Sequence, residues 1–276
     1  MTLTLSGVGY RYAGATRPSL LDVDLSLPDG AVVGVVGASE AGKSTLCLVA
    51  SGLAPRTIGG HIRGRITLDG AAVDAMPMHE LSSRVGIGFQ NPANQLSQVC
   101  DTVFEEVAFG PMNLGLPRDD VLDRTWRALA QTGIEALAAR DPRRLSGGQQ
   151  QLAAIAGLLA LRPGHLVLDE PTAQLDPAGT QMVADAVAGL AADGASILVA
   201  EQKTDVLAAI CSHVVALRDG HVVLDGPARE VLADPALDEL GVSAPAGVRL
   251  VRAAQGAGLA AAARSRLAEA IEGIGA

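Results

Sequence analysis

A glycine-rich segment that ends in a lysine and a serine has the composition of a phosphate-binding loop. Its two glycines, Gly37 and Gly42, have four residues between them, and Lys43 and Ser44 follow directly. Glycines let the backbone curl so that successive N–H groups point at phosphate oxygens, and the next helix presents its positive end. Lys43 would reach the outer phosphates, and Ser44 would offer its hydroxyl to Mg²⁺. The candidate binding residues are Gly37, Ala38, Ser39, Glu40, Ala41, Gly42, Lys43, Ser44 and Thr45.

Three short apolar runs predict strands that are buried on both faces of a parallel sheet. They cover residues 31–36, 166–168 and 196–200, and each stops at a polar cluster. The first stops at the glycine-rich loop, the second at Asp169 and Glu170, and the third at residues 201–202. Ligands of open α/β sheets bind beyond the carboxyl ends of the strands, so we expect these three endings to share one crevice.

The acidic pair at the end of the second run has a chemical interpretation beside a phosphate-binding loop. Asp169 would hold Mg²⁺ through water, and Glu170 would polarise an attacking water molecule. Considered alone, an apolar run followed by two acids is the ordinary end of a strand with solvated carboxylates. The presence of the glycine-rich loop favours the catalytic interpretation of the two acids. For the loop itself, the plainer alternative is a flexible glycine-rich turn.

The run Leu145–Gln151 predicts the start of a helix. Ser146 and Gln149 form a capping-box pattern ahead of the apolar residues 152–161. Gly147 and Gly148 leave the N-terminus of this helix uncovered, so its free N–H groups could meet a phosphate. A plain helix cap explains the same residues when they are taken by themselves.

Composition limits the class of protein. The 276 residues are 49% hydrophobic and 18% charged, which excludes a disordered chain. An aromatic content of 2% and a formal charge of −9 argue against a nucleic-acid partner. The longest uncharged apolar stretches fall short of the roughly 20 residues that span a bilayer, and no secretory signal opens the chain. Three scattered cysteines fit free thiols in a reducing cytosol.

Taken together, these motifs are similar in residue type and order to the ATP-binding subunits of ATP-binding cassette (ABC) transporters. The resemblance covers nearly the whole chain, and Leu145–Gln149 matches the family signature. It implies an α/β fold with a P-loop NTPase (RecA-like) core, an antiparallel β flank and a helical insertion subdomain. The ATPase domain would span residues 1–240, with the insertion at about 91–161. A tail, residues 241–276, would follow, either floppy or helical and supporting a dimer.

The same resemblance implies ATP and Mg²⁺ as cofactors and a head-to-tail dimer with two shared sites. The signature residues Ser146, Gly147, Gly148 and Gln149 would contact ATP held by the other subunit. Gln90 would touch Mg²⁺ and sense a membrane partner, and Asp176 lies in a loop that would couple the two sites. Tyr12 would stack on adenine, although a strand tyrosine more often packs internally and Tyr10 could serve instead.

Gln202 stands where the family usually places a histidine that bonds the γ-phosphate. Glutamine donates a hydrogen bond but carries no charge, so γ-phosphate sensing would be weakened or asymmetric. The implied catalytic residues are therefore Glu170, Lys43, Gln90 and Gln202. The implied metal ligands are Ser44, Gln90 and Asp169.

Within the family, residues 89–96 and 102–111 resemble the ATPases of energy-coupling factor (ECF) transporters. Thr102 and Glu105 also form a capping box, which predicts a helix from that point. The resemblance implies ATP-driven import of a vitamin or metal ion, by a cytoplasmic subunit peripheral on the inner face of the membrane. Its partners would be a transmembrane coupling subunit, a substrate-binding membrane subunit and a second ATPase, of the same or an unlike chain. The alternatives are a soluble ABC ATPase acting on nucleic acid or ribosomes, and a poorly hydrolysing regulatory subunit, because of Gln202.

Overall fold

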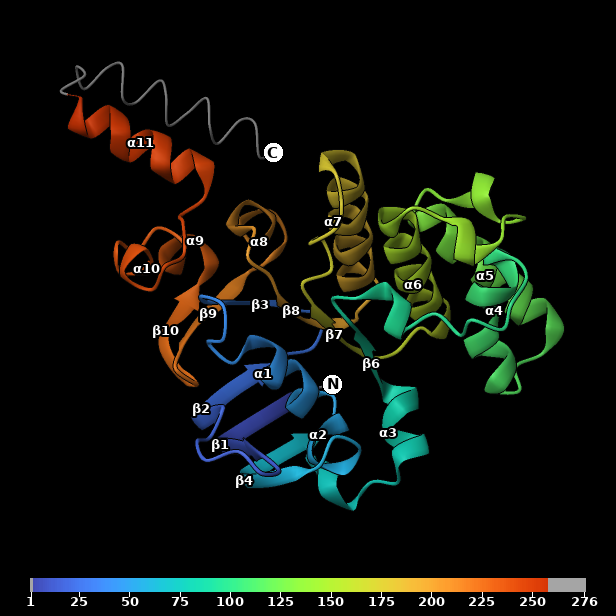
Figure 1. Ribbon diagram of the computed structural model, residues 1–276, viewed down its shortest axis with the longest axis horizontal. Helices are drawn as coiled ribbons and strands as arrows, with labels where there is room; N and C mark the ends of the chain where they lie inside the picture. The colour runs from blue at the N-terminus through green and yellow to red at the C-terminus, as the bar shows by residue number, and fades with distance from the viewer. Residues whose placement is uncertain (1, 258–276) are drawn as a thin grey trace.

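The larger of two sheets carries the strands predicted to end in polar residues. In the computed structural model, which describes residues 2–257, its strand order is β10-β9-β3-β8-β7-β6 (Figure 1). All neighbours pair in parallel except β9 and β10. The strands are β3 (Val32–Val36), β6 (Val85–Gly88), β7 (His165–Asp169), β8 (Ser196–Ala200), β9 (His213–Arg218) and β10 (His221–Pro227). The three predicted strands correspond to β3, β7 and β8, which are adjacent and fully buried, so their carboxyl ends meet at one edge.

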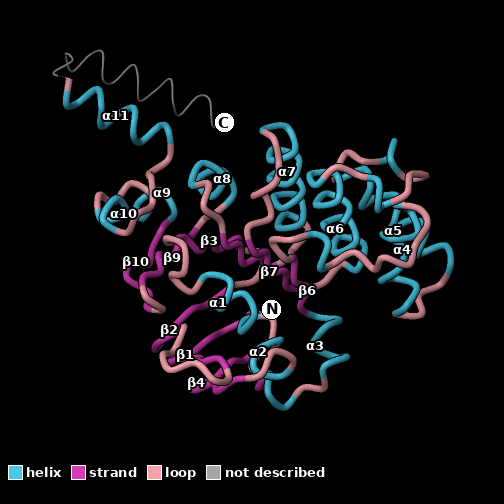
Figure 2. Tube along the Cα trace, viewed as in Figure 1, coloured by secondary structure: helices cyan, strands magenta, loops and turns pink. Residues whose placement is uncertain are grey.

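A smaller antiparallel sheet flanks this core. Its strand order is β2-β1-β4-β5, and it lies beside α1 (Figures 1 and 2). Residues of α1, including Leu46, Cys47 and Val49, pack in one apolar cluster with side chains of both sheets. The elements here are β1 (Leu3–Tyr12), β2 (Leu20–Leu27), α1 (Lys43–Ala50), α2 (Leu53–Arg56), β4 (Gly60–Leu68), β5 (Ala71–Ala72) and α3 (Met78–Arg84). The helix that follows the glycine-rich loop is therefore wedged between the two sheets.

Three helices lie together beside the β6 edge of the larger sheet (Figure 1). They are α4 (Val103–Asn113), α5 (Arg118–Gln131) and α6 (Gly147–Leu161). Both predicted capping boxes are formed, one by Thr102 and Glu105 at α4 and one by Ser146 and Gln149 at α6. In the described part of the chain, residues 92–161 contain only helices, 3₁₀ turns and loops.

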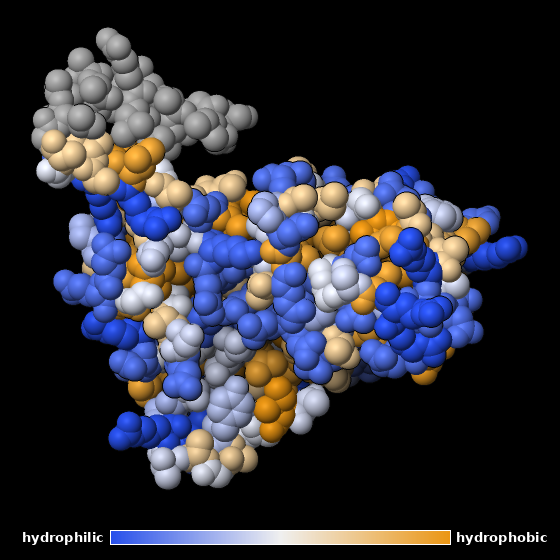
Figure 3. All heavy atoms as spheres, turned by 45° about the horizontal axis from the view of Figure 1, so that its top comes forward, coloured by the Kyte–Doolittle hydropathy of each residue, from blue (hydrophilic) through white to orange (hydrophobic). Residues whose placement is uncertain are grey.

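The remaining helices lie beside the strands from β7 to β10 or project from the sheet (Figure 1). They are α7 (Pro177–Ala192), α8 (Thr204–Ile210), α9 (Ala228–Val231), α10 (Ala236–Glu239) and α11 (Ala246–Gly256). Helix α11 extends away from the body in Figure 1, and its Leu250 is half exposed. The rest of the expected tail, residues 258–276, lies outside the described residues. No helix within residues 2–257 has the length and apolarity needed to cross a membrane. The face in Figure 3 shows hydrophilic residues with hydrophobic patches between them.

Candidate nucleotide site

The glycine-rich loop connects β3 to α1, and two of its glycines are required by close packing. Gly42 has φ 109° and precedes α1 without a side-chain cap, which leaves the first N–H groups of the helix uncovered. A Cβ on Gly42 would lie 2.8 Å from the Ser19 carbonyl oxygen, and one on Gly37 would lie 2.5 Å from that of Leu217. The curled backbone that a phosphate requires is thus compatible only with glycine at both positions.

Lys43 directs its charge into the loop. Its side chain is 5% exposed, and its Nζ donates to the carbonyl oxygens of Gly37 at 2.9 Å and Ala38 at 3.0 Å. The same Nζ lies 3.8 Å from Glu170 Oε1. The lysine thereby joins the phosphate-binding loop to the acidic end of β7. This is the juxtaposition that the sequence predicted for the crevice.

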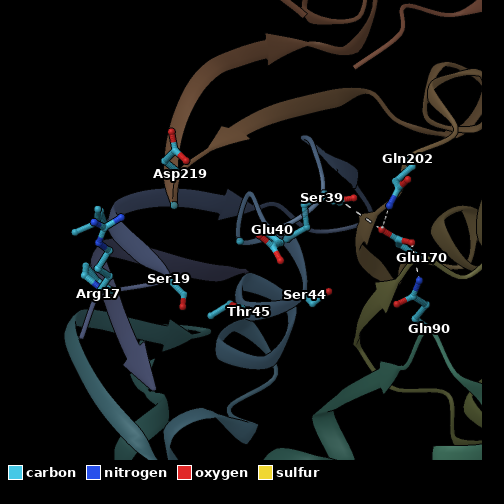
Figure 4. A pocket seen from close by; sticks show the side chains of 15 residues that line it. Arg17, Ser19, Ser39, Glu40, Ser44, Thr45, Gln90, Glu170, Gln202 and Asp219 are labelled. Atoms are coloured by element: carbon cyan, nitrogen blue, oxygen red, sulfur yellow. Dashed lines mark hydrogen bonds and ion pairs between the residues drawn. The ribbon is translucent and has the colours of Figure 1, made fainter. Parts of the chain in front are cut away.

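Glu170 accepts hydrogen bonds from two side-chain amides that follow neighbouring strands. Gln90 Nε2 donates to Oε2 at 2.9 Å, and Gln202 Nε2 donates to Oε1 at 2.7 Å. Gln90 follows β6 and Gln202 follows β8, on either side of β7. Figure 4 shows both amides pointing at the carboxylate. Glu170 itself has φ 48°, a conformation uncommon outside glycine, and it is 7% exposed.

Asp169 has the properties of a cation ligand. It is 9% exposed, and its Oδ1 is buried without a hydrogen-bond partner in the described protein. Burial raises the pKa of Asp169, and the charge of Glu170 adds to the increase, while a hydrogen bond from Ser44 and the charge of Lys43 oppose it. A buried, unpartnered carboxylate oxygen beside a serine hydroxyl fits a hard cation such as Mg²⁺. Among the described residues no group of three or more His, Cys, Asp or Glu is placed to hold a metal ion.

Lys43, Glu170 and the two glutamines line a cavity of about 1030 Å³, large enough for a nucleotide (Figure 4), whereas Asp169 is not part of its lining. Nine predicted site residues line it: Ser39, Glu40, Gly42, Lys43, Ser44, Thr45, Gln90, Glu170 and Gln202. Sequence reasoning missed another group, which comprises Arg17, Pro18, Ser19, Leu21, Asp219 and Gly220. They belong to the β1–β2 connection, the start of β2 and the β9–β10 turn, which carry no motif. In Figure 4, Arg17 and Asp219 lie on the opposite side of the cavity from Glu170.

The two tyrosines considered for adenine stacking differ in accessibility. Tyr10 is 1% exposed, and its hydroxyl donates to the carbonyl of Gly59, so its ring belongs to the core. Tyr12 is partly exposed, and its hydroxyl lies 3.1 Å from Thr45 Oγ1 at the loop helix. The rings contact edge to face, with centroids 4.9 Å apart. Only Tyr12 therefore offers a ring near the loop, although it is not part of the cavity lining.

The signature residues and Asp176 lie outside this cavity within one chain. A Cβ on Gly147 would lie 2.9 Å from Gln174 Oε1, and one on Gly148 would lie 3.3 Å from Leu175 Cδ2. The start of α6 thus faces the loop that precedes α7. The carboxylate of Asp176 accepts a hydrogen bond from Gly179 N at 2.7 Å, so within the chain it caps α7.

Comparison with known proteins decides the family. Residues 20–173, more than half of the chain, match the family model described as ABC transporter. The chain belongs to the ABC transporter family. The chain is accordingly an ABC-type ATPase, and its fold is that of an ABC ATPase cassette.

Two relatives and one solved structure show which members of the family the chain resembles. The nickel import ATP-binding protein NikO of Rhodobacter capsulatus is 41% identical, over 84% of this chain and 92% of the relative. The energy-coupling factor transporter ATP-binding protein EcfA1 of Halalkalibacterium halodurans is 35% identical, over 93% and 90%. The structure of cbiO1 from Clostridium perfringens, part of the ABC transporter complex cbiONQ, superposes with a TM-score of 0.74. It is 32% identical and covers 86% of this chain and 92% of its own.

Proposed function

We propose that this ABC ATPase binds Mg²⁺–ATP in the cavity at the phosphate-binding loop and hydrolyses it to drive import through a membrane partner. The observation that carries the proposal is the placement of Glu170. Its carboxylate lies at the loop that would hold the phosphates, fixed by Gln90 and Gln202 and 3.8 Å from the Lys43 ammonium. A carboxylate held in this way can orient and polarise a water molecule for attack on a phosphate.

Catalysis would consist mainly of positioning the phosphates and the attacking water and of neutralising the phosphate charge. The backbone N–H groups of the loop and the Lys43 ammonium would bind the phosphates. Ser44, Asp169 and Gln90 would hold Mg²⁺, which when bound supplies further neutralisation of phosphate charge. Glu170 would take up the proton of the attacking water while its two amide donors keep it oriented. Tyr12, whose hydroxyl lies 3.1 Å from Thr45 Oγ1, would stack on the base beside the cavity.

The signature residues support a shared site between two ATPase subunits. The capping box of α6 occupies the N–H groups of Ser146 and Gln149. Those of Gly147 and Gly148 belong to the first turn, where helical N–H groups have no partner within the helix. Because they lie outside the cavity of their own chain, we propose that they bind ATP held by a second ATPase subunit. Asp176, at the loop facing them, would take part in the same contact.

The membrane partner would dock on the helical subdomain near Gln90. Four large apolar side chains are exposed on or beside α4, namely Val99 (72%), Phe109 (39%), Met112 (62%) and Leu114 (49%). Four exposed large apolar side chains within one short segment make that segment a candidate interaction surface. The cbiO1 structure is named as part of a complex, cbiONQ. A transmembrane coupling subunit with a substrate-binding membrane subunit is the partner we propose.

The cargo we propose is a transition-metal ion or a vitamin. The name of one relative, a nickel import protein, supports a metal ion. A vitamin rests only on the sequence resemblance to the ATPases of energy-coupling factor transporters, among which another relative is named. Such a subunit would work at the inner face of the membrane.

A Glu170→Gln variant tests the proposal. We expect it to bind ATP as the unaltered chain does, to lose turnover and to accumulate as an ATP-bound dimer, because the amide cannot accept a proton from water. ATP turnover, nucleotide binding and size-exclusion chromatography measure these effects. Glu230→Gln is the matched control, because Glu230 is exposed on α9, away from the cavity. Hydrolysis by Glu170→Gln at the unaltered rate would contradict the role given to Glu170.

The alternative of a poorly hydrolysing regulatory subunit has one observation in its favour. Gln202 contacts Glu170 directly, but its amide brings no positive charge to the γ-phosphate. A Gln202→His variant separates the two functions, since a large rise in turnover would favour the regulatory subunit. The formal net charge of the chain, −9, weighs against a nucleic-acid partner.

A further inference from the structure

Five consecutive residues after β8 are hydrogen-bonded to three other parts of the chain. Gln202 holds Glu170, as described above, and its neighbours hold other elements. The bonds involve Glu201 with Thr172, Lys203 with the loop before α7, Thr204 with Ser243, and Asp205 with Ala246. This segment, residues 201–205, therefore connects the catalytic carboxylate, the loop before α7 and the start of the tail.

Lys203 makes the most extensive of these connections. Its Nζ donates to the carbonyl oxygen of Thr172 at 2.8 Å, to Thr180 Oγ1 at 3.2 Å and to the carbonyl oxygen of Leu175 at 3.4 Å. An ammonium group has three N–H donors, so this set of acceptors uses all of them. All three acceptors belong to residues 172–175 or to the first turn of α7. The bonds hold both ends of the loop to one charged group.

Glu201 fixes the same loop from its own side. Its carboxylate is 1% exposed and accepts hydrogen bonds from Thr172 Oγ1 at 2.6 Å and from the backbone N–H of Thr172 at 3.3 Å. Its other oxygen accepts from the backbone N–H groups of Gln202 at 2.8 Å and Lys203 at 3.2 Å. The backbone that carries Gln202 and Lys203 is thus itself bonded to the loop through a buried carboxylate.

The loop held by Lys203 is the one that faces the signature helix, with Gln174 and Leu175 next to Gly147 and Gly148. We infer that Lys203 is a positioning residue. It keeps residues 172–176 in a fixed position relative to Gln202, and through Gln202 relative to Glu170. Displacement of the loop at the contact with a second ATPase would then displace the catalytic carboxylate. This inference rests on the proposed function, and it adds a connection between the hydrolytic residue and the surface for the second subunit.

Lys203→Met in the full-length chain is the test. We expect kcat for ATP hydrolysis to fall about tenfold, as loss of a charge-assisted hydrogen bond implies. The KM for ATP should change less than twofold, because in the described chain the cavity lining includes Gln202 but not Lys203. Lys203→Arg, which restores the charge and the donors, should recover part of kcat.

Thr204→Val is the matched control. It also removes one hydrogen bond of 2.8 Å from the same segment, but that bond leads to Ser243 and the tail. We expect its kcat to equal that of the unaltered chain. An unchanged kcat in Lys203→Met, or an equal loss in Thr204→Val, would overturn the inference. If Lys203→Met does not fold, as shown by thermal unfolding, Thr180→Val replaces it, with an expected two- to threefold loss of kcat that an unchanged rate would contradict.

Hydrogen exchange separates this inference from the proposed function. In Lys203→Met we expect faster exchange of the amides of residues 172–176 and unchanged exchange in residues 37–45, whether or not the chain hydrolyses ATP. Equal exchange in the 172–176 loop would overturn the positioning role. Absence of ATP hydrolysis in the unaltered chain would instead refute the proposed function, and exchange would still decide the role of Lys203.

Discussion

The hydrogen bond between Gln202 and Glu170 makes a quantitative prediction about turnover. Gln202 Nε2 lies 2.7 Å from Oε1 of a carboxylate that is 7% exposed, and Gln90 bonds the other oxygen. In Gln202→Ala, Oε1 loses this donor, and the carboxylate can rotate about the remaining bond to Gln90. The reactive oxygen is then correctly oriented for a smaller fraction of the time.

The size of the effect follows from the kind of bond that is lost. A hydrogen bond to a charged group contributes about 1.5–3 kcal/mol, which corresponds to roughly 10- to 150-fold in a rate. We expect kcat of Gln202→Ala to fall within that range. The KM for ATP should change by about threefold or less, since the loop and Lys43, which would bind the phosphates, remain in place. Steady-state ATPase assays over a range of ATP concentrations measure both quantities.

Gln202→His is the matched comparison, because imidazole also offers an N–H donor to Glu170. We expect its kcat above pH 7.5 to lie within about threefold of the unaltered value. Below that pH its rate should vary as the imidazole titrates, with an ordinary pKa near 6.5, whereas glutamine does not titrate. Unchanged turnover in Gln202→Ala would refute the argument that Gln202 positions Glu170.

Two further predictions concern Asp169, the proposed metal ligand, and the helices of residues 92–161. Burial raises the pKa of Asp169 above 3.8, so without metal the folded protein favours the protonated carboxyl. The stability that the folded state gains from this protonation is lost as the pH rises through the raised pKa. Mg²⁺ requires the ionised form, so the increase in melting temperature produced by Mg²⁺ with ATP should vanish as the pH falls through the same pKa. An Asp169→Asn variant with the same Mg²⁺ response would contradict this. Thr102→Ala removes half of the α4 capping box and should lower the free energy of unfolding by about 0.5–2 kcal/mol in urea titrations, whereas Thr102→Ser should not.

The central sheet and the phosphate-binding loop could be predicted because local sequence determines them. Buried parallel strands read as short apolar runs, and the strand over residues 196–200 was predicted with the bounds that β8 has. The glycine motif is likewise local in sequence, although the atoms that exclude a Cβ at Gly37 and Gly42 are not: they are the carbonyls of Leu217 in β9 and of Ser19 in the β1–β2 connection. The motif was readable without knowledge of those contacts.

Other features depend on tertiary contacts or on backbone geometry. Arg17 and Asp219 reach the cavity only because the β1–β2 connection and the β9–β10 turn fold over it, and nothing in their spacing indicates this. Residues 121–139 carry helix signals in the sequence, but the structure does not form one continuous helix there. Helix α5 ends at Gln131, and Gly133, with φ 65°, turns the chain before a short 3₁₀ helix. That glycine was the available signal for the break.

Sheet order places residues that follow two different strands on the two oxygens of Glu170. Strand β7 lies between β6 and β8, so Glu170 at its end is flanked by the residues that follow both neighbours. Gln90, on one oxygen, begins the chain segment that leads into the helical subdomain, and Gln202, on the other, begins the segment that holds the loop before α7. A membrane partner on α4 and a second ATPase at the loop would therefore act on opposite oxygens of the same group. Under the proposed function, hydrolysis requires both amides in place, so Gln90→Ala and Gln202→Ala should each cost turnover, and the double variant should cost less than the product of the two, because either loss alone already frees the carboxylate to rotate.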